Sequence, residues 1–467
     1  MHDDRSPLGI RIPRMLRPLL RRNYRLLFVT LLCALVADGM WMIAMVWQVI
    51  RMGGSPTSVS VVSGGAAAGL LVSTLAGGVL ADRLPQQRIL FVLEVLNAVV
   101  IGGVGALVLL DAVTVPMMLG ATFALGLVSG FYFPAYSALV PRLVSPGELL
   151  AVNGYESAVR PAASMALGPA VAGWLIALHS PGLALVIAGC LPLVGAVSVA
   201  RIRLDDDGAA DSGAEEAGHP LRELWEGVQY VRRTPWLLAT LLFASLLVLL
   251  VTGPLDVLLP FAIKDRAGGG PSDHSMVLAA YGFGGVAGAL FMASRKMPRR
   301  YLTVMMALWG LGELPLAAFG LATNVLVMVA AGFVLGVIFE APVVIWGTLL
   351  QRRVPRRLLG RVSSLDFFVS LVFMPLSLAL AGPVSHAIGL TATFVLAAVL
   401  PIPLAAVAIL AARMPRDELE HPLPEDEAGD DPAGGAEDEP GDEPGAGPGD
   451  APVTPTVNAP ASPRTVG

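Results

Sequence analysis

The sequence is poor in charge, in cysteine and in lysine. Only 14% of its 467 residues are charged, whereas a soluble protein of ordinary composition carries about 25%. The two cysteines, Cys33 and Cys190, lie apart in apolar segments, so neither metal binding nor redox chemistry is expected. The two lysines, Lys264 and Lys296, do not stand in a GK[ST] sequence, so no phosphate-binding loop is expected either.

Signatures of catalysis are also missing. The chain contains no HExxH or GxSxG sequence and no histidine cluster, which are the patterns of metalloproteases and serine hydrolases. The stretch "GFGGVA" at Gly282 has the glycines of a dinucleotide fingerprint, but it lies within an apolar run and not between a strand and a helix. We therefore expect a protein that is not an enzyme, with no catalytic residue, no cofactor and no nucleic-acid partner.

Long apolar runs are what the sequence has in abundance. Hydrophobic residues make up 55% of the chain, and the mean hydropathy is +0.70. A helix needs about 20 apolar residues to cross a bilayer, and segments of that length recur from end to end. They predict an all-α membrane protein with twelve transmembrane helices, at about 24–50, 58–81, 89–110, 116–140, 157–178, 183–200, 236–262, 275–294, 301–322, 326–350, 362–385 and 390–412.

The basic residues predict how these spans are oriented. If the N-terminus is inside, all of the 31 lysines and arginines except Arg51, Lys264 and Arg266 fall in cytoplasmic segments. Basic residues accumulate on the cytoplasmic side of membrane proteins. We expect a multi-pass protein of the cytoplasmic (inner) cell membrane with both termini in the cytoplasm.

A long loop after the sixth span divides the chain into two halves. "LGLVSG" at Leu125 and "LGVIFE" at Leu335 occupy similar places in the two halves, an arrangement that duplicated transporters show. The loop has helical apolar spacing, which favours an amphipathic helix on the membrane face or, alternatively, a soluble linker helix. The expected domains are a basic N-terminus at 1–22, a six-helix bundle at 23–200, the central loop at 201–235, a second six-helix bundle at 236–412 and an acidic tail at 413–467.

The tail is rich in proline, glycine and acidic residues and has hardly any large apolar side chain. Such a composition cannot offset the entropy of ordering, so the tail is expected to be disordered. Removal of the residues after Arg416 should then leave folding and activity intact.

One charged stretch, "GGVLADRLPQQR" from Gly77 to Arg88, stands between the second and third spans. It resembles the signature loop of the major facilitator superfamily, although Pro85 replaces the usual glycine. "FYFPAYSALVPRLV", "LLAVNG" and "GPAVAG" resemble the macrolide- and enterobactin-exporter-like drug:proton antiporters of that superfamily. The resemblance covers about residues 15–412 and implies two pseudo-symmetric six-helix bundles around a central cavity that opens alternately to either side.

The resemblance also implies roles for two motifs. The loop aspartate is expected to face the N-terminus of the eleventh span, where the helix dipole favours an anion, and to latch the cytoplasmic side; an ordinary wet turn is the alternative. The latch residues would be Gly78, Asp82, Arg83, Arg88 and Arg142. Gly168, Pro169 and Gly173 of "GPAVAG" resemble an antiporter-type helix motif, with close small-residue packing as the alternative reading.

Ionisable groups at membrane depth are costly and are candidates for function. Asp38 and Glu340 lie near the centres of the first and tenth spans, and Asp256 lies in the outer third of the seventh. We expect these three to exchange protons or bind a cation. Glu313 is expected to make a structural hydrogen bond, and Glu94 to extend toward the membrane surface.

Apolar and aromatic side chains predict the substrate cavity. Trp41, Met42 and Met45 share a helix face with Asp38, and flexible thioethers accept varied lipophilic ligands. Tyr132 and Tyr136 share a face of the fourth span, where cavity lining and ordinary packing are both open.

The sequence therefore predicts a monomeric secondary transporter whose partners are a small-molecule substrate, protons and the lipid bilayer. Its expected function is efflux of an amphipathic, drug-like molecule in exchange for protons. Export of a siderophore or another metabolite is an alternative within transport. A non-transporting membrane sensor or scaffold is the alternative from another class.

Overall fold

The computed structural model describes residues 18–81, 85–145, 148–149, 152, 156, 159–203 and 220–423. All of them belong to one compact unit, Met1–Pro424. Within this part of the chain, eleven helices are long and apolar enough to cross a membrane, and one shorter apolar helix accompanies them. The prediction of an all-α membrane protein is confirmed.

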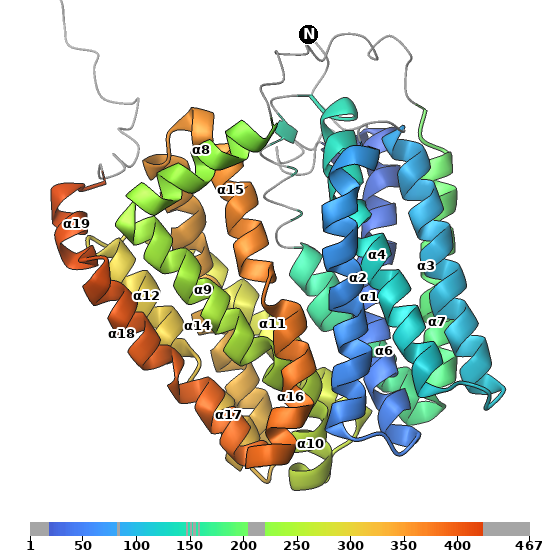
Figure 1. Cartoon of the computed structure of the whole chain (residues 1–467). Coiled ribbons are helices and arrows are strands. Elements are labelled where there is room, and N and C mark those ends of the chain that lie inside the picture. Colours follow the sequence, from blue (N-terminus) through green and yellow to red (C-terminus); the bar gives the residue numbers. More distant parts are fainter. Residues whose placement is uncertain are drawn as a thin grey trace, which may run out of the picture. The chain divides into compact units, whose positions relative to one another are not determined.

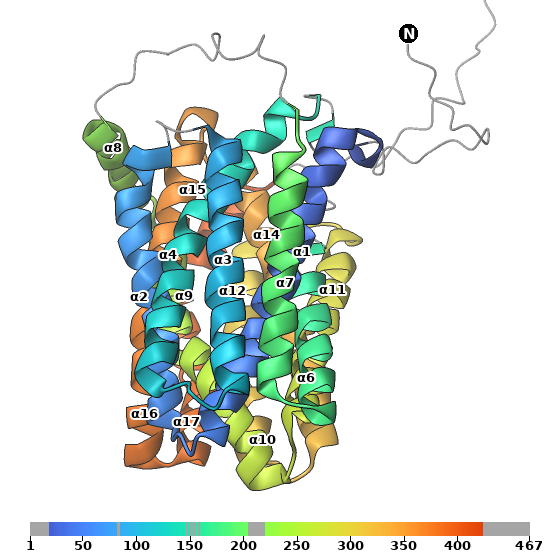
Figure 2. The same ribbon diagram turned by 90° about the vertical axis from the view of Figure 1, so that its right-hand side faces the viewer.

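The helices of the first half follow one another closely along the chain. They are α1 (Arg22–Arg51), α2 (Pro56–Ala81), α3 (Gln86–Leu109), α4 (Val115–Leu139) with the short turn η2 (Val140–Arg142), the π-helical turn η4 (Ala162–Leu167) continued by α6 (Gly168–Leu178), and α7 (Pro181–Ala200). Figure 2 shows α3 and α7 side by side, and α7 also packs against α1.

Several spans of the second half are built from two helical pieces. Its elements are α8 (Pro220–Arg233), α9 (Pro235–Gly253), η6 (Pro254–Leu258), α10 (Leu259–Ala267), α11 (Pro271–Ala293), α12 (Tyr301–Gly312), α13 (Leu316–Leu321), α14 (Val325–Arg353), α15 (Arg356–Leu371), α16 (Met374–Ile388), α17 (Leu390–Val399), α18 (Pro401–Ala411) and α19 (Met414–Glu420).

The eleventh predicted span, at 362–385, differs from the expected single helix. The chain forms α15, pauses at Val372 and Phe373, and resumes as α16. Pro375 explains the interruption, because proline lacks the N–H that would bond to the carbonyl of Leu371. The apolar piece of this span is therefore the short helix α16.

The two halves meet mainly through α2 with α16 and α6 with α11, and α1 also contacts α11. Two buried hydrogen bonds cross this contact. The N–H of Gly382 donates to the hydroxyl of Ser60 at 2.7 Å, and the indole of Trp47 donates to His274 at 3.3 Å. In Figure 1 the two sets of helices separate toward the end at which α8 lies.

The amphipathic helix of the central loop is α8, which packs on α9 and α15 at the end of the second half (Figure 1). Glu226 of α8 pairs with Arg361 of α15, and the Tyr230 hydroxyl donates to the carbonyl of Arg353 at 3.3 Å.

The prediction that a disordered tail begins at residue 413 is wrong, because a helix follows that residue. Met414–Glu420 forms α19, whose Met414 and Glu418 side chains are buried. The rest of the tail, from residue 424 onward, lies outside the described residues.

Candidate functional site

Asp38 lies in the middle of α1 with an exposed side chain, although its neighbours Ala37 and Gly39 are buried. A carboxylate in the middle of a long apolar helix thus has access to open space. The apolar side chains that were expected to line the substrate cavity beside Asp38 are less exposed, because Trp41 and Met45 are buried in the main hydrophobic core. Met42 is half-buried against the same core.

Glu94 of α3 does not extend to the membrane surface, so that expectation is wrong. Its side chain is fully buried, and its Oε1 accepts a 2.9 Å hydrogen bond from the Tyr132 hydroxyl of α4. Its Oε2 is buried and has no hydrogen-bond partner among the described residues. A Cβ atom at Gly195 would lie 2.9 Å from that oxygen, so the absence of a side chain on α7 makes room for the carboxyl group.

Asp38 lies close enough to Glu94 and to Tyr132 to interact with both electrostatically. The structure thus places Asp38 and Tyr132, which were both predicted site residues, near Glu94, which was not. We call Asp38, Glu94 and Tyr132 the first carboxyl cluster. Because an isolated buried charge is costly, this cluster is suited to carrying protons.

The second half has a comparable group. Tyr281 of α11 interacts electrostatically with Glu340, Glu313 and Asp256, and we call these four residues the second carboxyl cluster. Glu313 is 1% exposed, and neither of its carboxyl oxygens has a hydrogen-bond partner among the described residues. The structural hydrogen bond that was expected for Glu313 is therefore not found among the described residues. Asp256 and Glu340 are half-buried.

A third polar group lies at the end of α4 that leads into η2. The carboxylate of Glu156 accepts hydrogen bonds from the Tyr24 hydroxyl, at 3.0 Å, and from the Tyr136 hydroxyl. Its other oxygen is 3.4 Å from the guanidinium of Arg160. Arg160 in turn lies over the rings of Phe133 and Tyr136, 5.4 Å from each centroid.

Phe133, Tyr136, Glu156 and Arg160 border a cavity of about 520 Å³, which we call the vestibule cavity. A cavity of that size suits a drug-sized molecule. Tyr136 therefore lines a cavity, while Tyr132, whose ring stacks on it at 6.5 Å, belongs to the first carboxyl cluster. Sequence reasoning missed Glu156 and Arg160 because the aromatic partners of this pair, Tyr24, Phe133 and Tyr136, come from other helices.

The chain beside this cavity is held by Glu148. Its carboxylate accepts hydrogen bonds from the N–H of Ser145, at 2.9 Å, and from the hydroxyl of the same residue, at 2.7 Å. It also pairs with Arg21 at 2.9 Å. Partial burial acts to raise the pKa of Glu148, but the bonds from Ser145 and Arg21 outweigh it and hold the pKa below its ordinary value.

The central residues of the expected latch cannot be placed. Asp82 and Arg83 lie outside the described residues, and Gly78 belongs to the last turns of α2. Arg88 stands exposed in the first turn of α3, and Arg142 in η2 donates a 3.2 Å hydrogen bond to Gln86. The latch stays a prediction.

The glycines of the expected antiporter-type motif stand where helices approach closely. A Cβ at Gly168 would lie 2.7 Å from the carbonyl oxygen of Val36 on α1. A Cβ at Gly173 would lie 2.1 Å from the hydroxyl of Ser275 on α11. Pro169 packs at the same place against Gly39, the residue after Asp38. The motif thus joins the first carboxyl cluster to the contact between the halves.

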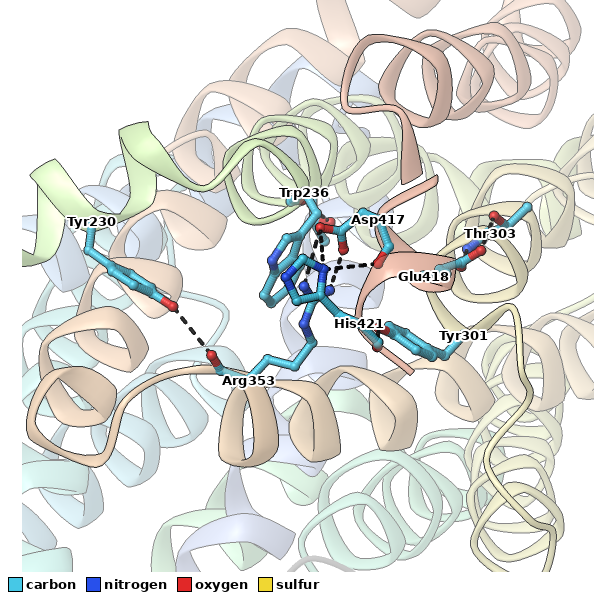
Figure 3. Close-up of polar contacts among 9 residues, drawn as sticks. Tyr230, Trp236, Tyr301, Thr303, Arg353, Asp417, Glu418 and His421 are labelled. Atoms are coloured by element: carbon cyan, nitrogen blue, oxygen red, sulfur yellow. Dashed lines mark hydrogen bonds and ion pairs between the residues drawn. The ribbon is translucent and has the colours of Figure 1, made fainter. Parts of the chain in front are cut away.

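A final polar cluster ties α19 to the second half (Figure 3). Arg353 at the end of α14 pairs with Asp417 and lies over the Trp236 ring, 4.8 Å from its centroid. The carboxylate of Glu418 accepts from the N–H of Thr303 at 2.6 Å, and the Tyr301 hydroxyl donates to the carbonyl of His421 at 2.8 Å.

The apolar helices define a membrane protein, and comparison with known proteins shows that it is a transporter and gives its family. The family model for the transmembrane secretion effectors of the major facilitator superfamily (MFS_3) matches residues 14–432. The chain belongs to this family. The resemblance deduced from the signature loop is confirmed, and so is the expectation that the chain is not an enzyme.

Two of the curated relatives are named as efflux proteins. The multidrug efflux pump Tap of Mycolicibacterium fortuitum is 32% identical over 411 residues, which is 84% of this chain and 96% of the relative. Macrolide efflux protein A of Streptococcus pyogenes is 24% identical over 394 residues, 82% of this chain and 96% of the relative. The chain is thus a multi-pass membrane transporter of the major facilitator superfamily that is related to multidrug and macrolide efflux pumps.

Solved structures of similar fold are distant in sequence. A bacterial homologue of the human lysosomal transporter Spinster, in an inward-facing and unoccupied conformation, has a TM-score of 0.63 at 16% identity and covers 85% of this chain and 98% of its own. The nucleoside transporter NupG has a TM-score of 0.63 at 11% identity and covers 84% of this chain and 98% of its own. At such identities the likeness shows the fold alone.

Proposed function

We propose that the chain exports an amphipathic, drug-like molecule from the cytoplasm in exchange for protons, by alternating access. The observation that carries the proposal is the first carboxyl cluster. Glu94 is fully buried with one carboxyl oxygen unpartnered among the described residues, and Asp38 lies nearby with an exposed side chain. A buried carboxyl group such as that of Glu94 is stable when neutral and costly when charged, which is the property that a proton carrier needs.

The substrate class rests on the relatives. Both curated relatives described above are named for efflux of drugs or macrolides. The vestibule cavity, with its aromatic walls and two charged groups, has room for a molecule that is partly lipophilic and partly polar. Export of a siderophore or another metabolite would use the same architecture, and only transport assays with defined compounds separate the two.

The proposal includes an orientation. The basic residues favour both termini in the cytoplasm, which puts Trp47, His274, Ser60 and Gly382 at the outer side. The contact between the halves would then close the outside and leave the vestibule cavity facing the cytoplasm. The bundles at 23–200 and 236–412 would act as two bodies of a monomer, with Asp82 and Arg83 latching the inner side in the opposite state.

Transport into inverted membrane vesicles tests the proposal. Vesicles that contain the protein should accumulate at least one member of a panel of amphipathic compounds, which includes fluorescein, rhodamine 6G and erythromycin, when their lumen is made acidic, and a protonophore should abolish the accumulation. Absence of any gradient-dependent accumulation of these and of metabolite candidates, at verified abundance of the protein, would favour the sensor or scaffold. Normal transport by Asp82→Asn at equal abundance would remove the latch from the proposal and leave the rest.

A further inference from the structure

The guanidinium of Arg160 has more hydrogen-bonding capacity left over than the carboxylate of its partner Glu156. Glu156 accepts from two tyrosine hydroxyls on one oxygen and from Arg160 on the other. Arg160 carries five N–H donors, and its 3.4 Å contact with Glu156 is the single hydrogen bond of this side chain among the described residues. Most of the unused hydrogen-bonding capacity of this pair therefore belongs to the cation, Arg160.

The surroundings of Arg160 are those of a binding site. The exposed fraction of the Arg160 side chain is 29%, and that of the Glu156 side chain is 8%. The guanidinium lies over the rings of Phe133 and Tyr136, and the Phe133 side chain is 54% exposed. The hydroxyl-bearing Ser137 lines the same cavity of about 520 Å³. A planar cation is thus presented beside an exposed aromatic face.

From this geometry we infer that the vestibule cavity is a docking subsite for the acidic or carbonyl-rich end of the transported molecule. A carboxylate or enolate on the ligand would bind the fork of Arg160, which matches two acceptor oxygens. A flat lipophilic body attached to that group would lie on Phe133. A cationic ligand is disfavoured at this position, because it would lie beside the guanidinium of Arg160, while the carboxylate of Glu156 already accepts three hydrogen bonds.

This inference rests on the proposed function, since it names the ligand chemistry of an efflux transporter. It does not depend on proton coupling, because binding at equilibrium needs no gradient. The two ideas can therefore fail separately.

Two dyes with the same flat xanthene body and opposite charge provide the probe. Fluorescein is anionic and rhodamine 6G is cationic at neutral pH. We would titrate the full-length protein, in lipid nanodiscs, against each dye by fluorescence polarisation, with empty nanodiscs as the blank. The wild type should bind fluorescein more tightly than rhodamine 6G.

Substitutions at Arg160 give the decisive comparison. Arg160→Gln should weaken fluorescein binding by about tenfold or more, the effect of removing a hydrogen bond to a charged group, and should leave rhodamine 6G binding unchanged or tighter. Arg160→Lys, which keeps the charge without the fork, should lie between. Arg201→Gln, the same change at an exposed residue at the C-terminal end of α7, should bind both dyes as the wild type does.

A second variant keeps the test valid if Arg160→Gln folds poorly. Phe133→Ala retains both charges and removes the aromatic face, so it should weaken the binding of both dyes. Tighter binding of rhodamine 6G than of fluorescein by the wild type would overturn the inference. So would unchanged fluorescein affinity in folded Arg160→Gln. Loss of gradient-driven transport in Asp38→Asn with fluorescein binding intact would support the subsite and the coupling role independently.

Discussion

The indole N–H of Trp47 on α1 donates a hydrogen bond to Nδ1 of His274 on α11, 3.3 Å away and buried between the two halves. Indole has a donor and no acceptor, so the contact requires an unprotonated Nδ1 on the histidine. Together with the bond from Gly382 to Ser60, it fastens the halves at the end that the proposed orientation puts outside.

Trp47→Phe should weaken this closure. It keeps a large apolar ring and removes the donor, at a cost of about 1 kcal/mol for one neutral hydrogen bond. We expect about a fivefold shift of the conformational equilibrium toward an outward-open state. Spin labels at Ala112→Cys and Thr323→Cys, in a background without Cys33 and Cys190, should show an added population at longer distance. An unchanged distance distribution would mean that this bond does not hold the closed state.

Glu94→Gln separates the proton-carrying role of Glu94 from its structural role. Glutamine preserves the acceptor for the Tyr132 hydroxyl but cannot release a proton, so abundance should stay near that of the wild type while gradient-driven export is lost. Glu94→Ala leaves the Tyr132 hydroxyl without this partner, so its abundance should fall. Export driven by an imposed pH gradient would be measured in vesicles at matched protein content. Wild-type export by Glu94→Gln would leave Glu94 with a structural role only.

The positions of Asp38 and Glu94 show what the sequence could and could not predict. The lengths of the apolar runs were enough to predict the spans, and Pro375 was a visible signal for the break between α15 and α16 that the hydropathy pattern concealed. The inward direction of Glu94 was not predictable, because it depends on the small Gly195 of α7 and on Tyr132 of α4. These residues meet only when three helices pack.

The vestibule cavity and α19 were missed for a related physical reason. Glu156 is held in place by a hydrogen bond from Tyr24, which is 132 residues away in the chain. Asp417 looked like one acidic residue among many in a polar tail, yet it pairs with Arg353 across 64 residues. Composition averages over a segment and therefore overlooks a short helix that long-range contacts stabilise.

Truncation of the chain should be tolerated after Leu423 but not after Arg416. The shorter chain loses Asp417 and Glu418, and Arg353, whose side chain is only 10% exposed, loses its ion-pair partner. Loss of one partner of a largely buried pair is destabilising, by about 1–3 kcal/mol for the hydrogen bonds alone. Thermal unfolding of purified protein, followed by tryptophan fluorescence, should show a lower Tm for the shorter chain and for Asp417→Asn. Equal Tm values for the two truncations would show that α19 adds no stability.

Asp38→Asn tests the coupling site most directly. Asparagine resembles the protonated carboxylic acid in shape and is permanently neutral, so a carrier that must lose its proton once per cycle would be blocked. We expect gradient-driven accumulation of the dye that the wild type transports to disappear in inverted vesicles, while exchange of that dye down its own gradient continues. Exchange should continue because the vestibule cavity and the contact between the halves do not involve Asp38. Asp265→Asn, the same change at an exposed position near the end of α10, should transport as the wild type does. Accumulation by Asp38→Asn that still responds to the pH gradient would exclude Asp38 as the proton carrier and would direct the search to Glu340 in the second carboxyl cluster.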